Sequence, residues 1–213
     1  MRKTALMFLL CAFGTALNVI FNRVFAGSGM GLPLYMDTVL TITVTFIGGL
    51  FWGCLTGLLT NVIGHTMNFW GWEGYLFSLC NILTAVITWK FTCIFHSELT
   101  FISDKNENEN TSFFKSCRLD NIMSKIFILM LLSFILCLAI SIMGGLIAFF
   151  IEIIKTPQSI NPASQHSAFY GGLPLVLREI VSRVPINIID RIISVFAGFG
   201  IAYVIGKVVN KNA

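Results

Sequence analysis

Residues 38–72 read TVLTITVTFIGGLFWGCLTGLLTNVIGHTMNFWGW and contain no Asp, Glu, Lys or Arg. A membrane-spanning helix needs about 20 mainly apolar residues. These 35 residues are too many for one crossing and slightly too few for two full ones. Gly48 and Gly49 mark the break, because glycine weakens a helix interior and permits a tight turn. We therefore predict two helices, about 34–48 and 50–68, of which the first is short.

Apolar runs on both sides of this stretch predict four further helices. They are Thr4–Phe25, Tyr75–Phe95, Ile126–Ile151 and Ile186–Val208. The first run follows Met1, Arg2 and Lys3 as a secretory signal would, but it is long enough to cross a bilayer and predicts a retained helix. The expected fold is an all-α polytopic membrane protein, with six transmembrane helices in one integral membrane domain over residues 1–213.

The composition agrees with a membrane protein. Of the 213 residues, 56% are hydrophobic and 11% are charged, whereas a soluble domain is about 25% charged. This excludes a cytosolic globular enzyme, a disordered protein and a nucleic-acid binder. Nine of the 24 charges lie in residues 98–125, which predicts a flexible polar loop. Residues 153–177 are rich in Pro, Gln, Asn and Ser and predict an outer loop.

An even number of crossings places both termini on one side. With the termini in the cytoplasm, nine Lys and Arg residues fall inside and five outside, in agreement with the positive-inside rule. The loop at 98–125 is then cytoplasmic, and the expected location is the cell (inner) membrane, as a multi-pass protein.

Small residues four positions apart let helix backbones approach closely in lipid. Three predicted helices carry such sets: Ala12 and Ala16; Gly49, Gly53 and Gly57; Gly198, Ala202 and Gly206. For the two glycine-containing sets we favour packing inside the protein's own bundle. The alanine pair is a candidate for contact with a partner helix.

Ionisable and polar residues at membrane depth are costly and often functional. Asp37 precedes the short second helix, where it could cap the helix or bind a ligand. Asn61, His65 and Asn68 share one face of the third helix, where they could line a cavity or be satisfied core residues.

An aromatic segment follows this face of the third helix. Trp72 and Tyr75 fit the aromatic belt at a membrane surface. The alternative is an aromatic wall for a flat ligand, with Glu73 as its hydrogen-bond partner.

The segment from Leu177 to Arg191 is the most polar part of the last apolar region. If it is helical, Glu179, Arg183, Asn187 and Asp190 fall on one face, and Arg178 lies beside them. Glu179 and Arg183 could form an ion pair, Pro185 could kink the helix, and Asp190 needs a partner such as Arg191 or Arg23. The face either lines a ligand site or is a self-neutralising network that pins the helix.

Motifs for enzymatic chemistry are missing from the sequence. It contains no Walker loop, no H-E-x-x-H and no G-x-S-x-G. The six cysteines form no C-x-x-C pair, and five lie in apolar runs, so neither a disulfide framework nor a metal site is expected. We expect a protein that is not an enzyme and has no cofactor.

The whole chain resembles a substrate-binding S component of an energy-coupling factor (ECF) transporter. The resemblance is carried by the size, the six helices, the short second helix after Leu-Pro-Leu-Tyr-Met-Asp37, the glycines at 48, 49, 53 and 57, and the pair Ala12 and Ala16. It implies a membrane receptor that captures a vitamin-like small molecule outside. Ala12 and Ala16 match the alanine docking motif, through which such a receptor would contact a transmembrane T component driven by two ATPase subunits.

The family's ligand residues vary with the substrate, so none is transferred, and the candidate site is built from the polar faces. It comprises the 27–36 loop and the 65–75 and 153–191 segments. The candidate ligand residues are Asp37, Asn61, His65, Asn68, Trp72, Glu73, Arg178, Glu179, Arg183, Asn187 and Asp190. A rival class is a membrane scaffold or sensor subunit of S-component-like fold, similar to the cell-shape protein MreD.

Overall fold

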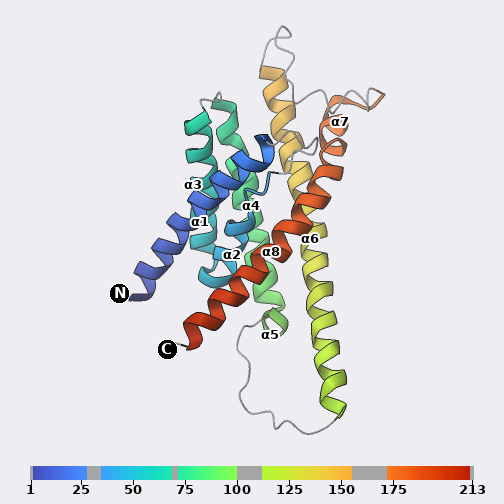
Figure 1. Ribbon diagram of the computed structural model, residues 1–213. Helices are drawn as coiled ribbons and strands as arrows, with labels where there is room; N and C mark the ends of the chain where they lie inside the picture. Colours follow the sequence, from blue (N-terminus) through green and yellow to red (C-terminus); the bar gives the residue numbers. More distant parts are fainter. Residues whose placement is uncertain (1, 28–34, 69–71, 100–111, 155–171, 212–213) are drawn as a thin grey trace.

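The computed structural model describes residues 2–27, 35–68, 72–99, 112–154 and 172–211 (Figure 1). Every regular element in these ranges is helical, which confirms the predicted all-α class. In chain order the helices are α1 (Arg2–Gly27), α2 (Val39–Gly48), α3 (Leu50–Asn68), the 3-10 helix η1 (Trp72–Phe77), α4 (Ser78–Ile94), α5 (His96–Leu99), α6 (Ser112–Ile154), α7 (Leu175–Val181) and α8 (Val184–Lys211).

Four helical segments of the described chain are long and apolar enough to cross a membrane. They are Thr4–Phe25, Trp72–Ile94, Ile122–Ile154 and Leu175–Lys207. Helix α2 has 10 residues, so it is about 15 Å long and too short to cross a hydrocarbon core of about 30 Å. The length and apolar composition of these four segments indicate a membrane protein. The predicted number of six crossings stays a prediction.

The predicted break between the second and third helices is confirmed. Helix α2 ends at Gly48 and α3 begins at Leu50. Between them Gly49 has φ +80°, a conformation that L side chains rarely adopt. Helix α2 begins at Val39 rather than near residue 34, and residues 28–34 lie outside the described part of the chain.

Helix α6 differs from the prediction, because it begins at Ser112 rather than near residue 126. Residues 112–125, which we expected within the polar loop at 98–125, are therefore helical. The error has a physical reason: hydropathy marks only the part of a helix that lipid covers. Residues 112–125 contain neither Gly nor Pro, so nothing in them stops the helix.

The polar segment before the last helix is also different from the prediction. It is not one continuous helix, because α7 ends at Val181 and α8 begins at Val184. Pro185 is the second residue of α8 and lies in its first turn. The N–H groups of a first turn have no partner within the helix, so the lack of an N–H in proline costs no hydrogen bond there. It therefore helps to start a helix rather than kink one.

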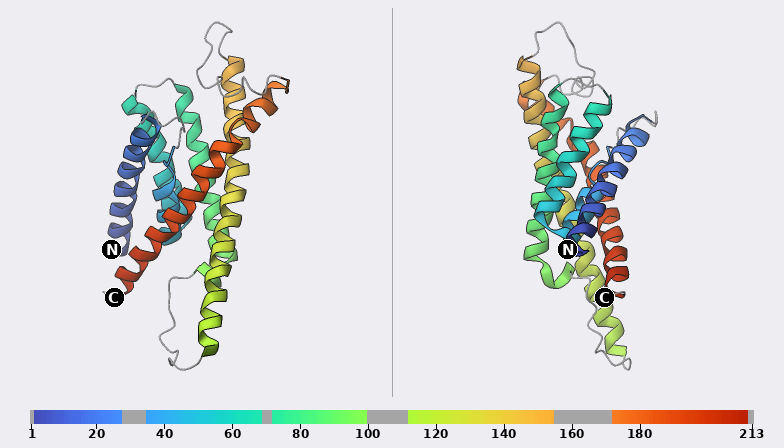
Figure 2. Two further views of the ribbon diagram at one scale, coloured as in Figure 1. Left: turned by 45° about the vertical axis from the view of Figure 1, so that its right-hand side comes forward. Right: turned by 90° about the vertical axis from the view of Figure 1, so that its left-hand side faces the viewer.

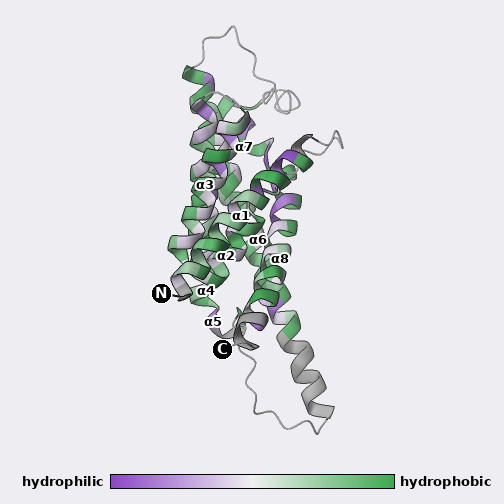
Figure 3. Ribbon diagram, turned by 60° about the vertical axis from the view of Figure 1, so that its left-hand side comes forward, coloured by the Kyte–Doolittle hydropathy of each residue, from purple (hydrophilic) through white to green (hydrophobic). Residues whose placement is uncertain are grey.

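Helix α2 lies at the centre of the bundle. Its residues from Val39 to Phe46 are all buried, and α1, α3, α4 and α8 pack around it. A short helix that is buried on all sides is stable only when other helices cover it, and its buried Thr43 and Thr45 hydroxyls donate hydrogen bonds to backbone carbonyl oxygens. The start of α1 and the end of α8 lie at one end of the bundle, with α7 at the other (Figures 1 and 2). The helices are mainly hydrophobic along their length, with hydrophilic stretches near α7 (Figure 3).

The end of the bundle that holds the chain termini is filled by apolar side chains. This cluster joins α2, α4, α5, α6 and α8, and its buried members are Ile42, Phe46, Phe91, Leu99, Ile128, Leu129, Leu132, Leu136, Val195 and Ala202. We call it the apolar plug. A second, smaller cluster around Cys80 and Ile140 joins α4 and η1 to α6 nearer the α7 end.

Close packing of α8 on α2 depends on Gly198. A Cβ there would lie 2.9 Å from the carbonyl oxygen of Val39 and 2.9 Å from the side chain of Ile42. We expect Gly198→Leu to destabilise the protein by about 2 kcal/mol or more, because the helices must separate. Gly200→Leu is the matched control, since a Cβ at Gly200 meets nothing within 4 Å. Unfolding of both variants by SDS in mixed micelles measures the difference, and equal stability would contradict it.

Candidate functional site

A pair of opposite charges on α8 is enclosed by the bundle. Asp190 is 0% exposed and Arg191 is 3% exposed. Their Oδ2 and Nη2 atoms are 2.6 Å apart. The prediction that Asp190 needs a partner is thus confirmed, with Arg191 in that place. Arg23, the other candidate, instead donates to the carbonyl oxygen of Met67 at 3.5 Å.

This α8 pair also fixes the segment that leads into α2. Asp190 accepts a hydrogen bond from the Met36 backbone N–H at 3.0 Å, and Arg191 donates to the Thr38 hydroxyl at 2.7 Å. Met36 has φ +47°, in the left-handed region that costs an L residue about 1–2 kcal/mol. Residues 36–38 therefore depend on α8 for their conformation.

Asp37 lies between α2 and α4. It does not cap α2, because the N-cap residue is Thr38 and no side-chain cap bond forms there. Instead, its Oδ2 accepts a hydrogen bond from the side-chain amide of Asn81 on α4 at 3.2 Å. Of the two interpretations left open by the sequence, the capping one is wrong.

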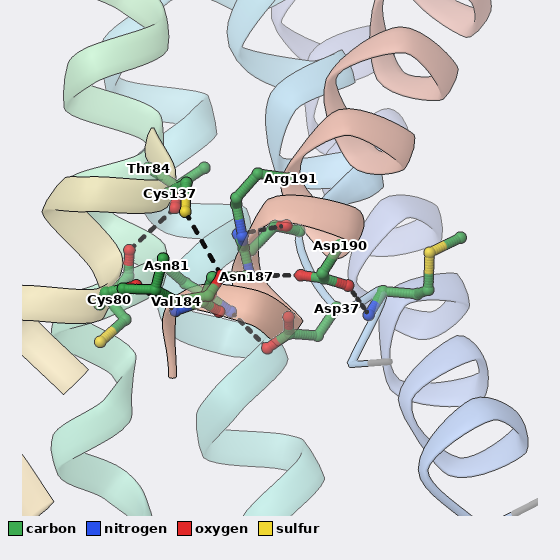
Figure 4. Close-up of polar contacts among 12 residues, drawn as sticks. Asp37, Cys80, Asn81, Thr84, Cys137, Val184, Asn187, Asp190 and Arg191 are labelled. Carbon is green, nitrogen blue, oxygen red and sulfur yellow. Dashed lines mark hydrogen bonds and ion pairs between the residues drawn. The ribbon is translucent and has the colours of Figure 1, made fainter. Parts of the chain in front are cut away.

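Helix α6 contributes a further buried polar residue, Ser141, beside these contacts. Its hydroxyl accepts a hydrogen bond from the Asn187 side-chain amide at 2.8 Å, and both residues are buried. Side chains from the start of α2 and from α4 and α8 converge here (Figure 4). We call the set the central polar layer; its members are Asp37, Asn81, Ser141, Asn187, Asp190 and Arg191.

Arg183, at the break between α7 and α8, lies beside the central polar layer. Its guanidinium carbon is 5.6 Å from the centre of the Phe77 ring. A Cβ built on Gly144 would be 3.7 Å from Arg183 Nη1 and 3.9 Å from Cys80 Sγ, so both side chains border the same spot on α6. Asn81, which binds Asp37, follows Cys80 directly in α4.

The predicted ion pair between Glu179 and Arg183 does not form in the described structure. Arg178 instead pairs with Glu152 of α6, with 3.7 Å between Nη2 and Oε1. Glu179 is 4% exposed, and its Oε1 atom has no hydrogen-bond partner. The polar face of the sequence is therefore split into a pair at the end of α6, a buried carboxylate on α7 and the central polar layer.

The predicted polar face of α3 does not reach this layer. The Asn61 side chain donates to the Gly57 carbonyl of its own helix at 3.4 Å. The His65 ring packs edge-on against Tyr75 of η1, with ring centres 6.0 Å apart. Asn68 is the last residue of α3, and its side chain lies outside the described part. Because the Asn61 side chain is hydrogen-bonded within its own helix, Asn61 fits the interpretation as a core residue and not as a residue that lines a cavity.

The aromatic segment forms η1 at the same end of the bundle. Trp72 is 55% exposed, as expected for an aromatic belt at a membrane surface. Glu73 is partly buried and is not without an interaction partner. The Tyr75 hydroxyl lies 3.1 Å from that of Thr66 on α3. These contacts fix η1 against α3 and give no support to an aromatic wall.

The sequence analysis missed Asn18, which is 0% exposed at the centre of α1. Its Oδ1 accepts a hydrogen bond from the Leu40 backbone N–H at 3.0 Å. Its amide donates to the hydroxyls of Thr41 at 3.1 Å and Thr60 at 3.3 Å. Asn18 thus satisfies a free N–H in the first turn of α2. The two amides of the first apolar run, Asn18 and Asn22, were the signal that could have identified it.

The small residues of the predicted helices fall into two groups, one inside the bundle and one on its surface. A Cβ at Gly53 or Gly57 would press on α2 or α4, so these residues pack inside the bundle, and Ala202 is fully buried. Ala12 and Ala16 are both exposed on α1. The alanine pair therefore faces outward, whereas Gly53, Gly57, Gly198 and Ala202 pack inside the bundle.

No group of three His, Cys, Asp or Glu residues suited to a metal ion occurs among the described residues. The fold and the site define an all-helical membrane protein with a buried charged layer above an apolar plug. No protein-family model, no curated protein and no solved structure matches the chain.

Proposed function

We propose that this protein is the substrate-binding subunit of an ECF-type transporter, a receptor that captures a vitamin-like micronutrient at the outer face of the cell membrane. The observation that carries the proposal is the central polar layer. Charged groups inside a membrane bundle are costly, and they are typical of substrate pathways. A protein that served only as a scaffold would not need these charges, because apolar side chains of similar volume often stabilise such a position equally well.

The order of layers along the bundle supports a site that opens toward one side. The apolar plug fills the bundle between the central polar layer and the chain termini. Polar groups such as Glu179, Arg183 and the Arg178–Glu152 pair lie toward the α7 end. With six crossings and cytoplasmic termini, a ligand enters from outside and is stopped by the plug.

A receptor of this kind has no energy source and must dock onto one. In the proposed assembly, the exposed face of α1 with Ala12 and Ala16 contacts the T component, and two ATPase subunits drive the release of substrate. Two small residues one turn apart permit close helix contact in lipid. Buried residues such as Cys11 and Asn18 hold the opposite face of α1 on the bundle.

Native mass spectrometry of the protein, purified in mild detergent, tests the receptor function. We expect a small molecule of vitamin size to remain bound, before or after incubation with a panel of vitamins. A protein that stays empty throughout would contradict the receptor function and favour the MreD-like scaffold, whose partner would then be another protein.

A further inference from the structure

Two opposite charges, Asp37 within the central polar layer and Arg183 beside it, have no ion-pair partner within the described structure. Asp37 has only the neutral amide of Asn81 as a side-chain partner. Arg183 lies on the Phe77 ring, and its Nε atom is buried without a hydrogen bond. In contrast, Arg191 is already paired with Asp190 at 2.6 Å.

Asp37 and Arg183 are linked through neighbouring residues of α4. Cys80 lies beside Arg183 at Gly144 of α6, and the next residue, Asn81, donates a hydrogen bond to Asp37. They nevertheless form no ion pair with each other, so more than 4 Å separates the carboxylate oxygens from the guanidinium nitrogens. A charge enclosed in a medium of low dielectric constant is stabilised by an opposite charge in direct contact with it.

From this arrangement we infer that the ligand is a small zwitterion, with its anionic group on Arg183 and its protonated amine on Asp37. A purely anionic ligand would leave Asp37 unpaired, and a purely cationic ligand would leave Arg183 unpaired. A zwitterion provides both counter-charges at once. This inference specifies the substrate class of the proposed receptor and therefore rests on that function.

The surroundings of the two charges suit a small organic zwitterion. The Phe77 ring provides an apolar face beside the Arg183 guanidinium. Arg183 and Cys80 both lie within ordinary contact distance of a Cβ built on Gly144, at 3.7 Å and 3.9 Å, so the two side chains are close neighbours over this part of α6. Guanidinium groups bind carboxylates with two parallel hydrogen bonds, which gives the contact its orientation as well as its strength.

Matched sets of ligands test the charge requirement on the full-length protein in detergent. Each set contains an α-amino acid, its methyl ester, which is only cationic, and its N-acetyl derivative, which is only anionic. Glycine, leucine, phenylalanine and histidine give four sets. Thermal unfolding and native mass spectrometry report binding. We expect the zwitterion to raise the unfolding temperature and bind at least tenfold more tightly than either derivative.

Two variants then assign each charge to its contact. Asp37→Asn is expected to bind the N-acetyl derivative as well as the amino acid, and Arg183→Gln is expected to bind the ester as well as the amino acid. Each variant should lose affinity for the zwitterion by about 30-fold or more. Glu152→Gln, at the exposed pair with Arg178, is the control and should keep the affinity.

The outcomes separate this inference from the receptor function. Equal binding of the derivatives, or a co-purifying molecule that lacks one of the two charges, would contradict the inference that the ligand is a zwitterion. The proposed receptor function would be unaffected by that result. If no probe binds and no small molecule accompanies the protein, both proposals fail.

Discussion

Asp190→Ala is expected to destabilise the protein by about 3–5 kcal/mol, the largest loss of stability that we expect from a single substitution in this chain. The change leaves Arg191, which is 3% exposed, without its counter-charge. It also removes the acceptor for the Met36 N–H, so the left-handed conformation at Met36 loses its support. Unfolding by SDS in mixed micelles, followed by circular dichroism, measures the loss.

Two further variants make this result specific. Glu152→Ala breaks an ion pair with a 43% exposed carboxylate, and we expect a change of about 1 kcal/mol or less. The double variant Asp190→Leu with Arg191→Leu removes both charges and should recover much of the stability. If Asp190→Ala unfolds like the wild-type protein, the α8 pair does not hold the start of α2.

The second large effect concerns transport. Replacing Ala12 and Ala16 together with Trp is expected to abolish uptake and leave ligand binding intact. Both alanines are exposed on α1, away from the central polar layer, so the bulky rings do not disturb the bundle. They would prevent the close helix approach that docking on a T component requires. Uptake of labelled ligand by cells and ligand binding by the purified variant are the two measurements.

Ile142→Trp provides the matched control for the transport experiment. Ile142 is 49% exposed on α6, so a ring there also faces lipid but lies on a different helix from the alanine pair. This variant should transport normally. Uptake that is unchanged in the alanine double variant would refute the docking face, whereas loss of uptake in both variants would point to a general effect of bulky residues.

Much of the fold could be predicted from the sequence, because its signals are local. Hydropathy located the four segments that can cross a membrane, and the glycine pair at 48–49 located the break before α3. Hydropathy failed at the start of α6, where the helix continues beyond its apolar part. It also did not predict the turn at residues 182–183, which separates α7 from α8.

The candidate site was less predictable. Of its members, Asp37, Asn187 and Asp190 were candidates from the sequence, and Arg191 was one of two candidate partners of Asp190. Asn81 and Ser141 became members only through their contacts. An asparagine or serine in an apolar run looks the same whether it bonds its own helix or another one. Asn61 bonds its own helix and Asn81 bonds Asp37, and nothing within four residues of either predicts this difference.

The sequence by itself determined that the chain is a helical membrane protein with polar groups at membrane depth, since hydrophobicity and helix breakers act over a few neighbouring residues. Only the tertiary structure decided which polar groups meet. Met36 and Asp190 are 154 residues apart in the chain, yet the Met36 backbone nitrogen lies 3.0 Å from Asp190 Oδ1. Such contacts depend on how α2 is enclosed by α1, α3, α4 and α8. The packing of all these helices at once sets this arrangement, and no local pattern encodes it.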